Sequence, residues 1–177
     1  AAQVLSDVLC GSNHAPLCRA ILEQELAEDV VLGCDEQCMQ PNLLLRVQNF
    51  READLPAIEA TIRNTLTALC ENGLDRAQIE ASLASFEFKL RERDYGTMPR
   101  GLVFELEILS SWLYGGDPAV RLRFGEVFDT LHAAVGTGYY ENLLRRLMLE
   151  NPHTAEVLLQ PSLTCGQARQ DRERESL

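Results

Sequence analysis

The chain of 177 residues is long enough for one domain, or one and a half. A hydrophobic share of 46% can fill a core, and a charged share of 24% is ordinary for a globular protein, so a disordered chain is excluded. The net charge of −11 argues against a nucleic-acid-binding surface, which needs clustered basic residues to displace counterions from phosphates. The same acidic balance fits plain solubility, or a surface that attracts cationic peptides.

The start of the chain and its cysteines indicate the compartment. The first residues show neither a signal peptide nor an apolar run long enough to span a bilayer, so we expect no membrane partner. Because they already have helical spacing, we expect further chain before Ala1. The six cysteines are irregularly spaced, which favours reduced, mostly buried thiols over a disulfide framework. These features predict a cytoplasmic or organelle-matrix protein.

Hydrophobic spacing predicts the elements of the first half of the chain. Residues 1–10 carry a helical stripe, and Pro16 suits the first turn of a second helix. Residues 30–32 are typical of a short strand, and residues 43–49 alternate apolar and polar side chains as a half-buried strand does. A third helix is expected to use Ile58, Ile62, Leu66 and Leu69 and to end at Asn72-Gly73.

The second half is predicted to be mainly helical. Asp75 is a good cap for a helix whose apolar face is formed by Ile79, Leu83, Phe86 and Leu90. Three more helical faces follow, with Leu102, Leu106, Leu109 and Leu113 in the first, Phe124, Val127, Phe128 and Leu131 in the second, and Tyr140, Leu143, Leu144 and Leu147 in the third. Asp117-Pro118 is expected to begin the second of these. Residues 155–160 then form a returning strand. The charged tail from Arg169 to Leu177 is too polar to fold alone, although it could start a helix in a longer chain.

This order of elements predicts an α+β fold, in which several helices cover one small, mainly antiparallel sheet and a helical extension follows. We expect residues 43–49 and 155–160 to be strands of that sheet, because each short strand needs a partner. We also expect Trp112 and Tyr114 to anchor the core rather than to stack on a ligand, since aromatic side chains dominate core burial.

The histidines and serines give no catalytic or metal-binding motif. His14, His132 and His153 each lack a second histidine or a glutamate at the spacing of a zinc-binding helix, and neither H-E-x-x-H nor H-x-x-E-H occurs. Surface or helix-capping roles are the plainer interpretation. Lone serines such as Ser12 and Ser82 have no recognisable base with its orienting group. We therefore predict no catalytic residue and no metal ligand, and the substrate-binding residues stay unknown.

Three further patterns have plainer alternatives. Cys34 and Cys38 would be half of a zinc site, but the second pair that such sites usually have is missing. The segment 115–118 (GGDP) lacks the lysine of a phosphate loop, and a helix stop followed by a helix start explains it. Gly136 and Gly138 lack the third glycine of a dinucleotide fingerprint and follow a helix instead of a strand.

Several short motifs nevertheless occur in a recognisable order. They are residues 73–92 (GLDRAQIEASLASFEFKLRE), 99–102 (PRGL), 112–118 (WLYGGDP), 151–153 (NPH) and 159–161 (LQP). In this order and spacing, the chain resembles the presequence-protease branch of the insulinase-like (inverzincin, pitrilysin-type) zinc metallopeptidases. The resemblance extends from about Leu9 to the tail.

The resemblance implies a longer parent of four related α+β domains, in which two halves joined by a helical linker enclose an unfolded peptide. Residues 1–163 would be the C-terminal part of the second domain with adjoining helices, and residues 164–177 the start of the charged linker. The zinc site, an H-x-x-E-H helix with a distal glutamate, would lie in the first domain. Zinc is therefore expected in the parent and not on this chain, whose partners would be the remaining domains and, within the parent, unfolded peptides.

Two other interpretations stay open at this point. The chain could be a stand-alone interaction or scaffold domain of the same fold, or an independent enzyme with a site that no motif marks. The upstream coding sequence separates them, because an intact H-x-x-E-H helix there favours the peptidase and a degenerate one favours the scaffold.

Overall fold

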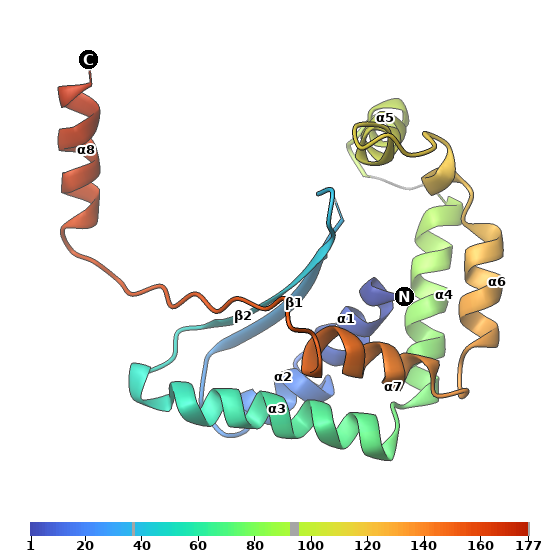
Figure 1. The fold of residues 1–177 in the computed structure, drawn as a ribbon, viewed down its shortest axis with the longest axis horizontal. Coiled ribbons are helices and arrows are strands. Elements are labelled where there is room, and N and C mark those ends of the chain that lie inside the picture. The colour runs from blue at the N-terminus through green and yellow to red at the C-terminus, as the bar shows by residue number, and fades with distance from the viewer. Residues whose placement is uncertain (37, 93–95, 177) are drawn as a thin grey trace.

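The computed structural model describes residues 1–36, 38–92 and 96–176 (Figure 1). Its helices and strands are α1 (Ala2–Cys10), α2 (Pro16–Leu22), β1 (Asp29–Asp35), β2 (Asn42–Gln48), α3 (Leu55–Asn72), α4 (Arg76–Glu92), α5 (Arg100–Trp112), α6 (Gly125–Ala133), α7 (Tyr139–Leu144) and α8 (Cys165–Glu175). Short 3₁₀ turns cover Glu52–Asp54 and Val120–Leu122, and a π-helical turn, Arg145–Leu149, continues α7. The predicted α+β class is confirmed.

The sheet is an antiparallel hairpin of β1 and β2, with Val30 opposite Val47 and Leu32 opposite Leu45. These four side chains share one face because side chains alternate along a strand. Val30 and Leu32 are buried in the core, and α1 and α2 both pack against β1. The helices therefore cover one face of the hairpin, as the alternation in residues 43–49 predicts.

The core lies where α1 and α2 meet β1, α3, α4 and α7. Its fully buried large side chains are Leu9, Leu17, Ile21, Leu66, Ile79, Leu83, Tyr140 and Leu144. Asp75 caps α4 as expected, since its Oδ1 accepts a hydrogen bond of 2.9 Å from the N–H of Ala77. The predicted apolar faces of α1, α2, α3 and α4 all contribute to this cluster.

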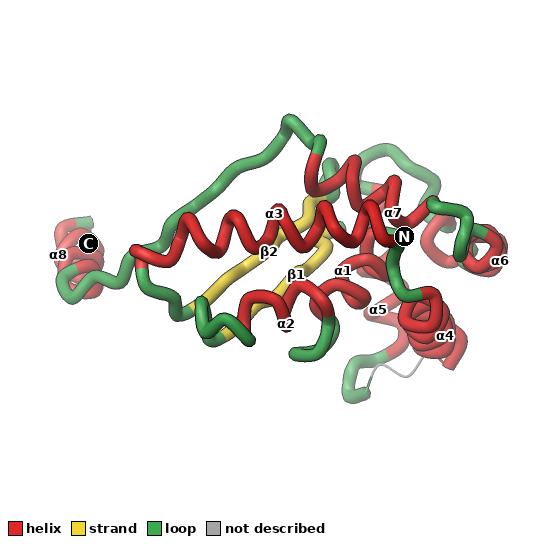
Figure 2. Tube along the Cα trace, turned by 90° about the horizontal axis from the view of Figure 1, so that it is seen from below, coloured by secondary structure: helices red, strands yellow, loops and turns green. Residues whose placement is uncertain are grey.

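The prediction that residues 155–160 form a strand of the same sheet is wrong. In the described residues the sheet has two strands, and this segment runs past β2 without joining the ladder (Figures 1 and 2). Leu159 is 87% exposed, and Gln160 donates a side-chain hydrogen bond of 3.1 Å to Glu52. Alternating apolar residues favour extended backbone, but a strand also needs a neighbour with unpaired backbone groups at the right spacing.

A second correction concerns the region that we call the arm, residues 96–122. Helix α5 packs mainly against the 3₁₀ turn Val120–Leu122 and stands away from the core (Figure 1). Asp117-Pro118 does not begin a helix; the Asp117 carboxylate accepts from the N–H of Ala119 at 2.9 Å in a tight turn, and α6 starts only at Gly125. An aspartate before a proline suits either a turn or a helix start, and here the turn forms.

Trp112 is also misplaced by the sequence prediction. Its side chain is 63% exposed at the end of α5, and the leucines of the predicted α5 stripe are partly exposed with it. Helical spacing shows which side of a helix is apolar, but it does not show that another element covers that side.

The exposure of Trp112 changes its expected energetic role. Trp112→Ala should change the free energy of unfolding by less than about 1 kcal/mol, because surface substitutions usually have small effects. Urea unfolding followed by NMR signals of buried methyl groups measures this value. A loss of about 3–5 kcal/mol, typical of a buried large aromatic, would contradict the exposed position.

Helix α8 stands apart from the rest of the chain, beyond the extended segment (Figures 1 and 2). All of its residues are exposed, and its internal contacts include Arg169 with Glu173 at 3.1 Å and Gln167 with Asp171 at 2.9 Å. Among the described residues, no helix combines the length and the apolar character that crossing a bilayer requires.

Candidate functional site

The three histidines lie on separate parts of the structure. His14 is exposed in the turn between α1 and α2, and His153 lies in the loop after the π-helical turn, where its backbone N–H donates to Asn151 at 2.9 Å. His132 is on α6, with Nε2 3.2 Å from a carboxylate oxygen of Glu87 on α4. Within residues 1–36, 38–92 and 96–176, no group of three or more histidine, cysteine or acidic side chains could hold a metal ion. The described residues therefore do not provide the ligand set of a zinc site, which the resemblance expects in another domain of the parent.

The contact of His132 with Glu87 is a surface bridge between α4 and α6. Glu87 accepts from Arg91 on its own helix at 2.5 Å and from His132 on the neighbouring helix. The bond from Arg91, followed by that from His132, holds the pKa of the Glu87 carboxyl below its ordinary value. This carboxylate is therefore ionised at neutral pH. Its contacts with Arg91 and His132 explain its orientation as part of a structural bridge between α4 and α6.

The thiols show no sign of activation. Cys34 and Cys38 lie at the tip of the hairpin, where they contact Glu36 at 3.9 Å and Asp35 at 3.7 Å. Burial, and then the negative charge of Glu36, raises the pKa of the Cys34 thiol. A raised pKa disfavours the thiolate that nucleophilic attack and metal binding both require. All six cysteines are free, but the expectation of mostly buried thiols is met only in part, because Cys18 is buried, Cys10, Cys34 and Cys70 are partly buried, and Cys38 and Cys165 are exposed.

In the core, Cys18 donates to the backbone carbonyl of Val30 at 3.3 Å. Burial raises the pKa of both Cys18 and its neighbour Cys10. These two thiols behave as small apolar side chains with a weak donor.

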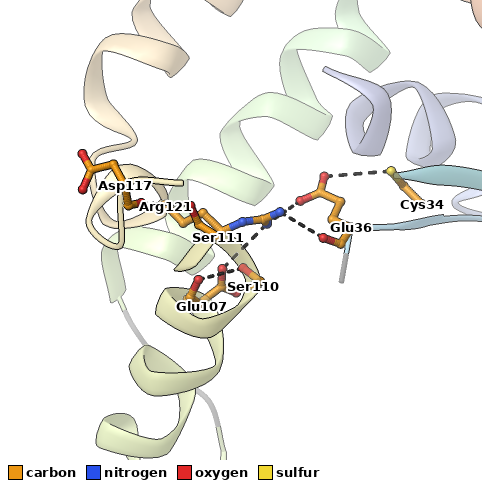
Figure 3. Close-up of polar contacts among 7 residues, drawn as sticks. All are labelled: Cys34, Glu36, Glu107, Ser110, Ser111, Asp117 and Arg121. Carbon is orange, nitrogen blue, oxygen red and sulfur yellow. Dashed lines mark hydrogen bonds and ion pairs between the residues drawn. The ribbon is translucent and has the colours of Figure 1, made fainter. Parts of the chain in front are cut away.

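The most elaborate polar contacts join the arm to the hairpin tip (Figure 3). Arg121 reaches from the 3₁₀ turn to Glu36, with Nη1 2.7 Å from a carboxylate oxygen and Nη2 donating to the backbone carbonyl at 3.1 Å. Glu107 of α5 lies 3.9 Å from the same guanidinium, and Ser111 donates to the carbonyl of Asp117 at 2.9 Å. Planar guanidinium geometry suits such two-point contacts, so Arg121 fixes the direction in which the arm leaves the core.

The glycine pairs have structural explanations. Gly136 has a φ of +76°, and a Cβ there would come within 2.6 Å of the guanidinium carbon of Arg76, so the residue allows both the turn and the close contact. Gly116 lies against Ser111, whose hydroxyl oxygen would be 2.5 Å from a Cβ. Both pairs lie in connections between helices, although the helix start expected directly after Gly115-Gly116 is a turn and α6 begins only at Gly125.

Sequence reasoning missed a groove beside β2. It has a volume of about 590 Å³ and lies between β2, α3 and the extended segment after the π-helical turn. The residues that line it are Leu45, Val47, Phe50, Leu55, Ile58, Glu59, Ile62, Arg63, Leu66, Met148, Leu149, Asn151, Thr154, Ala155, Glu156, Val157 and Leu158. The apolar alternation of β2 and the apolar stripe of α3 were both visible in the sequence, but the space between them depends on how α3 is placed.

A smaller hollow of about 310 Å³ lies between α1, the turn that follows it and α4. His14, Ser12 and Ser82 all line it, so the structure brings three of the residues considered from the sequence together. The Ser82 hydroxyl is buried and makes no hydrogen bond to the described residues. Because no hydrogen bond joins this hydroxyl to His14 or to another base among the described residues, the arrangement gives no activated nucleophile.

Comparison with known proteins identifies the class to which this α+β fold belongs. Residues 1–86 match the family model described as the peptidase M16 inactive domain. The chain is 35% identical to protein HypA of Clostridium perfringens over 158 residues. This alignment covers 89% of this chain and 16% of HypA. It is 31% identical over 162 residues to presequence protease 1, chloroplastic/mitochondrial, of Arabidopsis thaliana, covering 89% of this chain and 15% of the relative.

The mitochondrial presequence protease of Danio rerio aligns over 162 residues with 22% identity, covering 89% of this chain and 16% of the relative. The chain belongs to the M16, insulinase-like peptidase family, and the resemblance seen in its motifs is confirmed. It spans about a sixth of the length of the curated relatives that it matches.

Proposed function

We propose that this chain is a non-catalytic part of a zinc metalloendopeptidase that degrades unfolded peptides in an enclosed chamber. In this proposal residues 1–163 contribute to the chamber wall, and residues 164–177 begin the linker between the two halves of the enzyme. The zinc-binding helix belongs to another domain of the same polypeptide, and the remaining domains are the partners of this chain. We propose a cytoplasmic or organelle-matrix location.

The observation that carries the proposal is the similarity to presequence proteases over 89% of this chain. The family model that matches residues 1–86 describes an inactive domain, which agrees with a role outside the catalytic centre. In the described residues, the histidines are held apart on different elements, and no three potential ligands converge. Zinc hydrolysis needs three protein ligands, an open position for water and a general base, so the proposal assigns this chemistry to another part of the parent.

The net charge of −11 suggests the class of peptide that the parent would accept. An acidic wall attracts cationic peptides, and this attraction falls as salt screens it. Selection in the chamber would then depend on enclosed volume and charge rather than on a deep specificity pocket.

The proposal predicts that the purified chain binds no stoichiometric zinc and cleaves no peptide, whereas the parent polypeptide does both. Metal analysis and a quenched fluorescent peptide assay on the two proteins measure these properties. Activity of the parent should disappear with a chelator and return with zinc.

One tightly held zinc per chain, together with chelator-sensitive cleavage by the chain alone, would overturn the proposal. A parent with a degenerate H-x-x-E-H helix and no activity would instead support the scaffold alternative. The result that supports the proposal differs from both of these: the parent cleaves peptide, and the chain alone does not.

A further inference from the structure

The hollow of about 310 Å³ between α1 and α4 collects polar groups that the fold does not use. Helices α1 and α4 pack against each other, and the turn between α1 and α2 contributes the third side (Figure 1). Five polar side chains from these segments line the hollow, and they are Asp7, Ser12, His14, Gln78 and Ser82. In the part of the chain that the structure describes, none of the five side chains makes a hydrogen bond or an ion pair as an acceptor or donor partner of another group that would occupy it, Ser82 included.

Ser82 gives this hollow a group with an unmet need for a hydrogen bond. Its side chain is 4% exposed, and its hydroxyl has no partner among the described residues. An unpaired buried hydroxyl costs free energy, and folded proteins usually supply such a group with a partner. A serine hydroxyl has three staggered positions about its χ1 angle, so Oγ can turn towards a group that enters the hollow. We therefore expect the missing partner to come from the hollow.

The charge of the hollow favours a cation. Among the described residues that line it, Asp7 carries a full charge at neutral pH, and none is a lysine or an arginine. The Asp7 carboxylate lies over Gly11, where an added Cβ would be 2.5 Å from Oδ1, so the carboxylate is held beside the turn. The remaining polar groups are hydroxyls, an amide and an imidazole, and in their neutral forms all of them can accept a hydrogen bond. A ligand with one positive charge and several N–H donors suits this combination.

We propose that the hollow binds a guanidinium group, with Asp7 as its ion-pair partner and the neighbouring hydroxyl and amide oxygens as hydrogen-bond acceptors. A guanidinium is planar, matches a carboxylate at two points and is more weakly hydrated than an ammonium ion. Val8 and Ala81, which also line the hollow, provide apolar contact for its flat faces. The group has two possible sources, a free small compound and the arginine side chain of a peptide. The inference does not rest on the proposed function, since it requires neither a chamber nor zinc.

The first test titrates the full chain with N-acetyl-arginine amide and follows the signals of the hollow by two-dimensional NMR. The signals of Asp7, Gln78 and Ser82 should shift together, with half-saturation on the order of 1 mM. N-acetyl-citrulline amide has nearly the same shape without the charge, and it should bind at least about tenfold more weakly. N-acetyl-lysine amide should bind about threefold more weakly. Equal binding of the citrulline compound would exclude the ion pair, and equal binding of the lysine compound would overturn the assignment to a guanidinium.

Variants locate the binding in the hollow. Asp7→Asn should weaken it by about tenfold, and the exposed position of Asp7 lets the variant fold. Glu71→Gln is the matched control, because it removes the same charge from an exposed position on α3 outside the hollow and should leave binding unchanged. Ser82→Ala removes a hydroxyl that has no partner, so the folded spectrum should persist while binding weakens by about threefold.

Two further ligands distinguish the sources of the guanidinium. A capped alanine peptide with one central arginine should bind at least about tenfold more tightly than N-acetyl-arginine amide if the site takes a peptide side chain. Methylguanidinium should bind as tightly as N-acetyl-arginine amide if the site takes a free compound. No saturable shift with any of these ligands, or equal losses for Asp7→Asn and Glu71→Gln, would overturn the inference. None of these results depends on zinc content or cleavage, so either proposal can fail without the other.

Discussion

Tyr140→Ala should lower the free energy of unfolding by about 3–5 kcal/mol, the usual loss for a buried large aromatic side chain. The Tyr140 side chain is 1% exposed in the main core cluster, and its hydroxyl donates to the carbonyl of Leu131 at 3.1 Å. Truncation removes the apolar contacts of the ring and leaves that buried carbonyl without its partner. Urea unfolding followed by NMR signals of buried methyl groups gives the value.

Tyr140→Phe is the matched control, because it keeps the ring and removes only the hydroxyl. It should cost about 1–2 kcal/mol at neutral pH. Burial, followed by the neighbouring Tyr139, raises the pKa of Tyr140 to about 12 from its ordinary value of 10.0. The unfolded chain therefore releases this proton first, so the stability linked to it is complete below pH 10 and is lost as pH rises towards 12. The difference between wild type and Tyr140→Phe should narrow over that range, and a constant difference would contradict the burial of the phenol.

Leu83→Ala should cost about 2–5 kcal/mol, the range for leucine in a close-packed core. Leu83 is fully buried on α4, which packs against α1 and α6. Removing its side chain leaves a cavity that these three helices cannot fill without moving. The same unfolding measurement gives the value.

Leu113→Ala is the control for that substitution, since Leu113 also belongs to a leucine-rich helical stripe in the sequence. Its side chain is 70% exposed directly after α5, within the arm, so the change should stay within about 0.5 kcal/mol. Equal losses for Leu83→Ala and Leu113→Ala would mean that the arm packs into a core after all.

These two leucines also show what the sequence could predict. The stripe of Ile79 and Leu83 and that of Leu102 to Leu113 have the same helical spacing, and both were expected to face a core. Only the first does, because α1 lies against α4, whereas α5 packs mainly against a single 3₁₀ turn. Periodicity is a property of one helix, and burial is a property of at least two elements. Trp112 was assigned to the core because aromatic side chains dominate core burial, and its exposed position beside the same stripe shows that this tendency also needs a second element to cover it.

Helix starts were predicted correctly where all the interacting groups lie within a few residues of one another. Asp75 caps α4 through a bond to Ala77, and Pro16 lies in the first turn of α2. Asp117 before a proline was ambiguous, because its carboxylate suits a turn as well as a helix start. The strand predicted for residues 155–160 failed for a non-local reason, since a ladder requires a second backbone.

The contact of Arg121 with Glu36 could not have been predicted from the sequence, because 85 residues separate the two. It depends on the path of the chain through α4 and α5. The groove beside β2 could not have been predicted from the sequence either. Each of its walls has an ordinary apolar pattern, which does not show that the walls lie apart. The family resemblance came from short motifs in order, and it required no knowledge of which surfaces they form.

Helix α8 has a consequence for how this chain responds to heat. It has 11 residues, all of them exposed, whereas isolated helices shorter than about 12–15 residues are only marginally formed in water. Its ion pair between Arg169 and Glu173 adds only about 0.3–0.5 kcal/mol. On warming, α8 should therefore unwind gradually, ahead of the cooperative core. A calorimeter, which weights the heat absorbed by the core, and a spectropolarimeter, which counts helical peptide bonds, would then record different melting curves for the same chain.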